Sequence, residues 1–181
     1  MHPEIRRFPS AHFYDNLLTD GENVLATPDE PHYRTPCLGP YQFFDVRGRE
    51  ESGPSGSFAN RAEADIAVRL VELLVRAREA ARPDDGRSDS DAGAGGRATF
   101  EVGIVTPYRY QCELVRNSLR SRGVFWGPHR EITRVLVETV DSFQGRQLDV
   151  IIFSCVRSSP MGNVGFVSGE EEGWARNSLV H

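Results

Sequence analysis

The sequence predicts an α/β domain whose sheet is mostly parallel. Short apolar runs occur at 101–106, 135–140 and 149–156, and helical periodicity occurs at 60–80 and 109–121. Nearly continuous apolar runs of this length are typical of parallel strands that are covered on both faces. Strands that alternate with helices form the crossover units of such sheets. A chain of 181 residues is long enough to bury one core of this kind.

The elements of the first half follow in order. Little periodicity is visible up to about residue 40, and the FFDV segment at 43–46 is expected to form a short strand before a loop rich in Gly and Ser. A helix is expected from Asn60, which can cap its first turn, to Ala80. The segment 82–98 combines Gly, Ser, Asp and Arg without an apolar face, so we expect a flexible surface loop.

The second half supplies the strands of the predicted sheet. The first strand stops at Pro107, the helix at 109–121 ends before Gly123, and two further strands follow. Polar residues gather where the three strands end, at Thr106–Tyr108, Thr139–Gln144 and Arg157–Ser158. Because ligands of open α/β sheets bind at the carboxyl ends of the strands, we expect a binding site at this edge.

Composition excludes several classes of chemistry. All 21 basic residues are Arg, so neither a Walker A lysine nor a Schiff-base lysine is present in this chain. The net charge of −5 argues against general binding of polyanions and leaves a local basic groove possible. The three Cys and five His residues show no ligand spacing, so we expect no metal site. No membrane-spanning run or signal peptide is visible, and we expect an intracellular protein, cytoplasmic or nuclear, without a membrane partner.

The segment from Glu138 to Ser159 carries the most informative turn. Asp141, Ser142 and Gly145 crowd the end of a predicted strand, where hydroxyls and free backbone N–H groups can hold phosphate oxygens. A glycine at this place also allows close approach of a ligand to the backbone. These residues by themselves leave open a plain polar turn in which Asp141 acts as a cap.

Four segments of the chain resemble superfamily 1 helicases of the nonsense-mediated-decay and senataxin type. TVDSFQGRQLDVIIFSCVRS resembles motif V, and VGIVTPYRYQCELVRNSL resembles motif IV. MHPEIRRFPSAHFYDNLLTDG resembles the stretch that follows the family's Q-Y-R-M-H-P signature, and SFANRAEADIAVRLVELLV resembles its next helix. The matches occur in family order from Met1 to about Phe166. The resemblance implies the second, C-terminal RecA-like domain (P-loop NTPase type) of an ATP-driven nucleic-acid translocase.

The resemblance also implies roles for individual residues. Contacts with the backbone of single-stranded RNA or DNA are implied for the following positions: Thr106, Pro107, Tyr108, Thr139, Val140 and Ser142. Arg157 is a further candidate for a phosphate contact, beside Arg109 and Arg146. Gly145 and Gln147 are expected to border the nucleotide, which is ATP with Mg²⁺ in the complete parent. The implied partners are the single strand and the first RecA-like domain.

Three departures from the family pattern limit the expectation. The Tyr-Arg pair that precedes M-H-P is missing before Met1, Gln147 replaces the usual Glu, and 167–181 reads VSGEEEGWARNSLVH where motif VI is expected. We therefore expect a domain at 1–166 that is truncated at both ends, with a divergent tail. Since in-line attack on ATP needs the P-loop lysine, the metal and a stabilising arginine together, we assign no catalytic residue and expect no ATPase activity of this chain alone. The alternative is a degenerate RecA-like adaptor that binds nucleic acid or a protein partner without ATP turnover.

Overall fold

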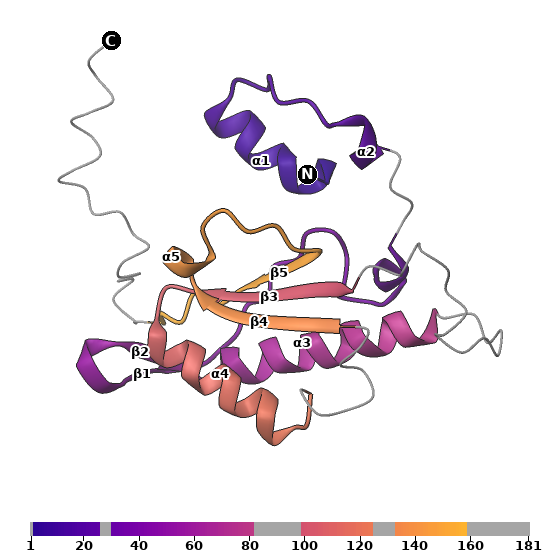
Figure 1. Ribbon diagram of the computed structural model, residues 1–181. Coiled ribbons are helices and arrows are strands. Elements are labelled where there is room, and N and C mark those ends of the chain that lie inside the picture. The colour runs from indigo at the N-terminus through magenta and orange to yellow at the C-terminus, as the bar shows by residue number, and fades with distance from the viewer. Residues whose placement is uncertain (1, 26–29, 82–98, 125–132, 159–181) are drawn as a thin grey trace, which may run out of the picture. The chain divides into compact units, whose positions relative to one another are not determined.

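The computed structural model describes residues 2–25, 30–81, 99–124 and 133–158 (Figure 1). The chain folds into two compact units. The first, called here the N-terminal unit, comprises Met1–Asp45 and Glu72–Asp89. The second, called the sheet unit, comprises Val46–Val71 and Ser90–His181. Every candidate residue from the sequence lies in the sheet unit.

The N-terminal unit contains a helix that the sequence did not predict. Helix α1 (Pro3–Phe13) starts with proline, and the Glu4 N–H donates to His2 Nδ1 at 3.3 Å. The helix was not predicted because its large apolar side chains are exposed, so they form no stripe that faces a core. The short helices α2 (Glu22–Leu25) and η1 (Pro31–Arg34) follow. Arg6 of α1 forms an ion pair with Asp20 in the segment after the helix, with 2.8 Å between Arg6 Nε and Asp20 Oδ1.

The sheet unit is built on three parallel strands, as the sequence predicted. They are β3 (Phe100–Thr106), β4 (Thr133–Thr139) and β5 (Val150–Phe153), in the order β4-β3-β5. Both pairings are parallel, and β3 is the central strand. The apolar runs therefore specified strands and their direction correctly. The α/β fold class is confirmed.

Two long helices cover one face of this sheet. Helix α4 (Arg109–Ser121) and the part of α3 (Arg61–Ala80) that belongs to the sheet unit lie on the same side of the strands (Figure 1). The core between helices and strands consists of fully buried aliphatic side chains: Val68, Val71, Val102, Ile104, Val115 and Leu119. Each of these contributes roughly 1.5–3 kcal/mol by its removal from water. Both helices agree with their predicted bounds because this buried stripe has the helical period.

The prediction of a strand at 43–46 is wrong. The Gly- and Ser-rich segment after it, expected as a loop, instead contributes to an antiparallel hairpin of β1 (Glu50–Ser52) and β2 (Phe58–Asn60), which are joined by the 3-10 turn η2 (Pro54–Gly56). Phe43 is 83% exposed and pairs with no described strand. A hairpin closes over a short local turn, whereas the apolar segment 43–46 pairs with no described strand and therefore forms no ladder.

Strand β4 begins and ends earlier than the sequence predicted, whereas β5 is shorter than predicted and less covered. Val140 starts the short helix α5 (Val140–Phe143) instead of ending β4. Coverage of β5 on both faces is wrong for the described part of the chain, because Ile151 is 47% and Phe153 is 48% exposed. The expected loop at 82–98 and the expected tail at 167–181 lie outside the described residues. None of the described helices has the length and hydropathy needed to cross a membrane.

Candidate functional site

The turns that follow β3 and β4 lie side by side. Thr106 and Thr139 are register partners at the ends of these strands. The Thr139 hydroxyl donates to Ser142 Oγ at 3.0 Å, and both side chains reach the surface. Thr106 differs, because its side chain is fully buried and its Oγ1 accepts from the Tyr108 N–H at 3.5 Å. Parallel pairing thus brings the two predicted motifs together, with only the β4 turn offering its hydroxyls to a ligand.

Gly145 occupies the turn that leads from α5 to β5. Its φ is +78°, and a Cβ built on it would meet no atom within 4 Å. The turn is closed by the Arg146 N–H, which donates to the Phe143 carbonyl at 3.1 Å. Glycine is therefore needed here for its left-handed backbone. The described neighbours would leave room for a side chain at this position. Gln147, two residues later, is exposed.

An open depression of about 390 Å³ lies over this turn. Apolar side chains form part of its lining: Val105, Val140, Phe143 and Phe153. Polar residues complete it: Asp141, Gln144, Gly145 and Arg146. An apolar surface with a few polar groups is the usual composition of a small-molecule site, and the volume falls within the common range of about 300–1,000 Å³. Gly145 borders this space, whereas Gln147 is not among the lining residues.

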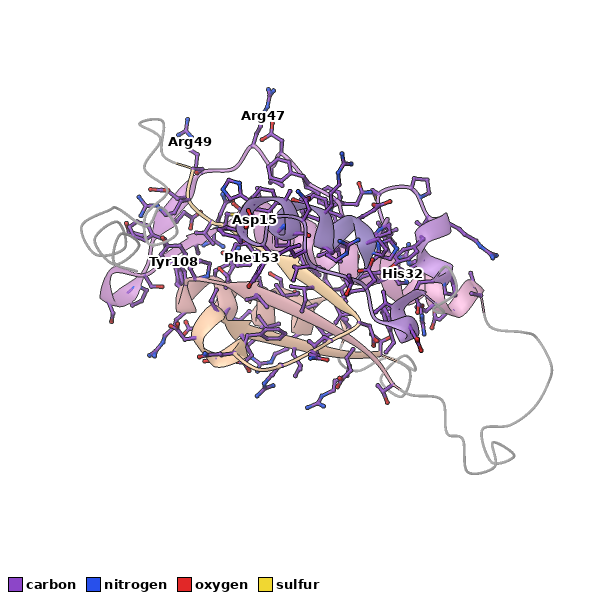
Figure 2. The ribbon with its side chains drawn as sticks, turned by 90° about the horizontal axis from the view of Figure 1, so that it is seen from above. Asp15, His32, Arg47, Arg49, Tyr108 and Phe153 are labelled. Carbon is purple, nitrogen blue, oxygen red and sulfur yellow. The ribbon has the colours of Figure 1, made fainter. Side chains whose placement is uncertain are left out.

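Tyr108 connects the turn after β3 to the β1–β2 hairpin. Its ring packs edge-to-face on Phe58 of β2, with the ring centroids 5.6 Å apart. The Tyr108 hydroxyl is buried and has no hydrogen-bond partner of normal geometry among the described residues. Pro107 beside it is half-buried. The predicted motif IV turn is therefore packed against the hairpin, and Figure 2 shows Tyr108 at one end of the sheet unit.

Arg157 is occupied by this chain's own residues. Its Nε lies 2.9 Å from Glu50 Oε2, its guanidinium lies 4.3 Å above the Phe58 ring, and its side chain is only 13% exposed. The Tyr108 hydroxyl and, after it, the Glu50 carboxylate raise the pKa of Arg157 against the opposing effect of burial. The Tyr108 effect is one of proximity, since that hydroxyl makes no properly oriented hydrogen bond. Arg157 is thus an internal clamp, unlike a solvent-facing phosphate ligand.

Other arginines of the sheet unit are open to solvent. Arg109 and Arg146 are exposed and form no ion pair with the described residues. Arg47 and Arg49, which precede β1, extend away from the sheet unit in Figure 2 and are likewise unpaired within the described ranges. These cations can attract phosphate groups without first breaking an internal contact.

A buried polar network behind the site was missed by the sequence reasoning. Gln111 on α4 accepts from the Asn60 N–H at 2.9 Å and donates to the Asn60 carbonyl and to Ser154 Oγ, both at 3.1 Å. Asn60 Oδ1 also accepts from the Glu63 N–H at 3.3 Å, which confirms the predicted cap. The one hint of this network in the sequence was Gln111, because a polar residue beside the buried stripe of a helix needs hydrogen-bond partners.

The comparisons with known proteins agree with this fold. A family model described as an AAA domain matches residues 1–172. The probable helicase MAGATAMA 3 of Arabidopsis thaliana is 36% identical over 168 residues, which are 93% of this chain and 19% of that protein. Helicase sen1 of Schizosaccharomyces pombe is 34% identical over 167 residues, 92% of this chain and 9% of that protein. Regulator of nonsense transcripts 1 of Caenorhabditis elegans is 34% identical over 172 residues, 93% and 14% of the two chains.

The chain belongs to the superfamily 1 helicases of the nonsense-mediated-decay and senataxin type. The resemblance inferred from the four sequence segments is therefore confirmed. Its parallel sheet with flanking helices is the RecA-like fold of this ATP-dependent helicase family. The chain spans less than a fifth of the length of these relatives, at 19%, 9% and 14%.

Proposed function

We propose that this chain is the second, C-terminal RecA-like domain of an ATP-dependent RNA/DNA helicase that acts inside the cell, in the cytoplasm or nucleus. It contributes contacts to a single strand and one wall of the ATP cleft. The main support is the register pairing of Thr106 with Thr139, which places the motif IV and motif V turns next to each other at the carboxyl edge of the sheet. Ligands of open α/β sheets bind at this edge.

The accessible residues of the β4 turn carry the proposed strand contact. Thr139, Val140 and Ser142 all reach the surface and can approach phosphate and sugar. Pro107 and Tyr108 form the neighbouring wall, and the buried Thr106 shapes their turn through its hydroxyl. Such contacts go to the backbone of the strand, so binding tolerates any sequence and weakens with salt. Arg157, the further candidate for a phosphate contact, would have to exchange its pairing with Glu50 for the phosphate.

The proposed nucleotide wall is the Gly145 turn with Gln147. Gly145 leaves open space for a ligand, and Gln147 is exposed beside it with an amide that can bond a ribose hydroxyl. ATP with Mg²⁺ does not fit the residues of this chain alone, because all 21 basic residues are Arg and no lysine can reach the phosphates. We propose that the first RecA-like domain of the complete parent supplies that cradle and the metal ligands.

Strand binding tests the proposal directly. A fluorescein-labelled oligouridylate and an oligothymidylate are titrated with the 181-residue chain and followed by fluorescence anisotropy at several salt concentrations. Thr139→Ala is expected to weaken binding about tenfold or more, since a hydrogen bond to a charged group contributes roughly 1.5–3 kcal/mol. Thr99→Ala is the matched control, because Thr99 is exposed at the opposite, amino end of β3. Equal affinities of the two variants at every salt concentration contradict the assignment.

A non-catalytic adaptor is the second candidate. It is favoured by Gln147, which stands where the family usually has the charged Glu and carries no charge itself. In a complete parent protein, a helicase domain makes strand binding depend on bound nucleotide, whereas an adaptor binds the strand equally with and without it. Gln147→Glu distinguishes them further, because it increases nucleotide affinity only if this turn faces the nucleotide.

A further inference from the structure

Val156 follows the end of β5 and has a backbone conformation that β-branched residues avoid. Its φ is +71° and its side chain is fully buried. A left-handed conformation places the Cβ of an L-residue against its own carbonyl, and the second branch of valine worsens the conflict. Such a residue persists only where surrounding contacts hold it.

Glu63 and Asn60 provide those contacts at the start of α3. Glu63 Oε2 accepts from the Val156 N–H at 2.9 Å and from the Ser154 hydroxyl at 2.6 Å. Asn60 Nδ2 donates to the Val156 carbonyl at 3.3 Å and to Glu63 Oε1 at the same distance. Both polar backbone groups of Val156 are therefore bonded to side chains of one helix end. A single carboxylate oxygen joins the end of β5 to that helix.

The left-handed turn directs the next residues toward the hairpin. Arg157 and Ser158 meet Glu50 of β1 in a reciprocal set of bonds: Arg157 Nε to Glu50 Oε2 at 2.9 Å, the Ser158 N–H to the same oxygen at 2.8 Å, and the Glu50 N–H to Ser158 Oγ at 2.9 Å. The Arg157 guanidinium also covers the Phe58 ring of β2. Both strands of the hairpin are thereby fixed to the segment after β5.

The hairpin is also packed on the motif IV turn. The Tyr110 N–H donates to Ser57 Oγ at 3.1 Å, and Phe58 lies edge-to-face on Tyr108. A Cβ on Gly53 would clash with the Tyr110 ring, so the hairpin backbone approaches the first turn of α4 closely. A continuous series of contacts thus connects Glu63 to Tyr108 through Val156, Arg157 and the hairpin.

We propose that Glu63 is a positioning residue for the candidate strand-binding surface. It holds Val156 in the left-handed conformation, this conformation places Arg157 and Ser158 on Glu50, and the clamped hairpin supports the Pro107–Tyr108 wall. In this proposal Glu63 itself does not contact the nucleic acid. The inference rests on the proposed function for the strand and on the described contacts for the clamp.

Hydrogen exchange in the 181-residue chain measures the clamp without any ligand. Glu63→Ala is expected to reduce protection about tenfold to a hundredfold at the Val156 N–H, which loses its carboxylate acceptor. The Ser158 and Tyr110 N–H groups, whose acceptors are Glu50 and Ser57, are expected to lose protection as well. Glu63→Gln keeps an oxygen acceptor and is expected to lose less. Glu113→Ala, an exposed glutamate on α4, is the matched control and leaves all of these amides unchanged.

Rescue by glycine separates positioning from general destabilisation. Val156→Gly and Val156→Ala both remove the buried isopropyl group, but only glycine adopts a positive φ without cost. In the Glu63→Ala background, Val156→Gly is expected to restore protection at Ser158 and Tyr110, and Val156→Ala is not. Equal rescue by both, or a loss in Glu63→Ala that stops at Val156, overturns the clamp.

Strand affinity of the same variants links the clamp to the surface. Glu63→Ala is expected to weaken oligouridylate binding several-fold, with recovery in the Val156→Gly double variant alone. If Thr139→Ala weakens binding and Glu63→Ala leaves it unchanged, the positioning role is overturned while the proposed function stands. If the chain binds no strand, or Thr139→Ala has no effect, the proposed function fails and hydrogen exchange alone decides the clamp.

Discussion

Gln111 illustrates how single residues organise this domain. It is fully buried in the first turn of α4, yet its amide oxygen and nitrogen are both bonded, to the Asn60 backbone and to Ser154. Unbonded, such an amide would be costly to bury, whereas bonded on both ends it fixes α3, α4 and β5 at defined distances. The residues behind the candidate surface therefore determine its shape as much as those on it.

Replacement of Gln111 is expected to be strongly destabilising. Gln111→Ala leaves a cavity and deprives the buried Asn60 N–H of its acceptor, so we expect a loss of about 2–4 kcal/mol in the free energy of unfolding. Urea denaturation followed by circular dichroism measures it. Gln147→Ala, at an exposed glutamine, should stay within about 0.5 kcal/mol. Similar losses in the two variants would disprove the role of the buried network.

The two cysteines of the sheet unit are expected to react slowly. Burial raises the pKa of the Cys112 thiol. Cys155 is exposed at the surface, and partial desolvation followed by the Glu63 carboxylate raises the pKa of its thiol. Because only the thiolate is nucleophilic, alkylation by iodoacetamide should be slow at neutral pH and accelerate as the pH rises through the raised values. The neutral Cys112 thiol stabilises the fold below its ordinary pKa, and this contribution is lost as pH rises through the pKa of the folded state.

Mass spectrometry of native and urea-unfolded chain gives the rates at each thiol. Glu63→Gln removes a negative charge near Cys155, so it should lower the pKa of that thiol and increase its alkylation rate. Cys112 alkylated at the same rate in folded and unfolded chain would contradict the effect of burial.

At the scale of elements, the turn between α5 and β5 depends on backbone conformation. Helix α5 has a single turn, and the chain reverses at Gly145 with φ +78° before β5 begins. The Phe143 carbonyl accepts the Arg146 N–H across this reversal. The left-handed residue thus fixes where the depression between α5 and β5 lies.

Substitution of Gly145 should be costly through φ alone. Gly145→Ala is expected to lower stability by roughly 1–2 kcal/mol, although the space around it is empty. Gly145→Asn is the matched variant, since asparagine tolerates the left-handed region and should lose clearly less. Thermal denaturation compares the two. If alanine and asparagine cost the same, the requirement is for something other than a positive φ.

At the scale of the whole molecule, the chain matches one part of each of the larger helicases to which it is similar. Its match to relatives covers 92–93% of its own length and less than a fifth of theirs. It contains the sheet, the two turns at its carboxyl edge and the network behind them, but no lysine for a P-loop. Hydrolysis of ATP needs that cradle, the metal and an arginine together.

The 181-residue chain alone is therefore expected to release no phosphate from ATP above the buffer rate. A coupled phosphate assay with and without oligouridylate measures this, with Gln147→Glu as a variant that should remain equally inactive. Phosphate release that increases with chain concentration would refute the assignment of the chain to the non-P-loop half of the cleft.

The helices, the strands and the family were predictable because each depends on short-range order. Apolar spacing located α3, α4 and the three strands within a few residues, and the motif order identified the helicase family. Helix α1 and the hairpin were missed for opposite reasons. Helix α1 exposes its apolar residues. The hairpin forms from a mostly polar segment, in which local turn geometry matters more than hydrophobicity.

The sequence by itself determined α3, α4 and the three parallel strands, since the periods of 3.6 and 2 are local properties of the backbone. It also determined that β3 ends at Thr106, directly before Pro107. Only the tertiary structure decided that Thr106 is buried beside an accessible Thr139, that Arg157 is held by Glu50, and that Val156 is left-handed. These facts depend on contacts between residues about 30 to 110 positions apart, and no local pattern records which distant partner satisfies a given polar group.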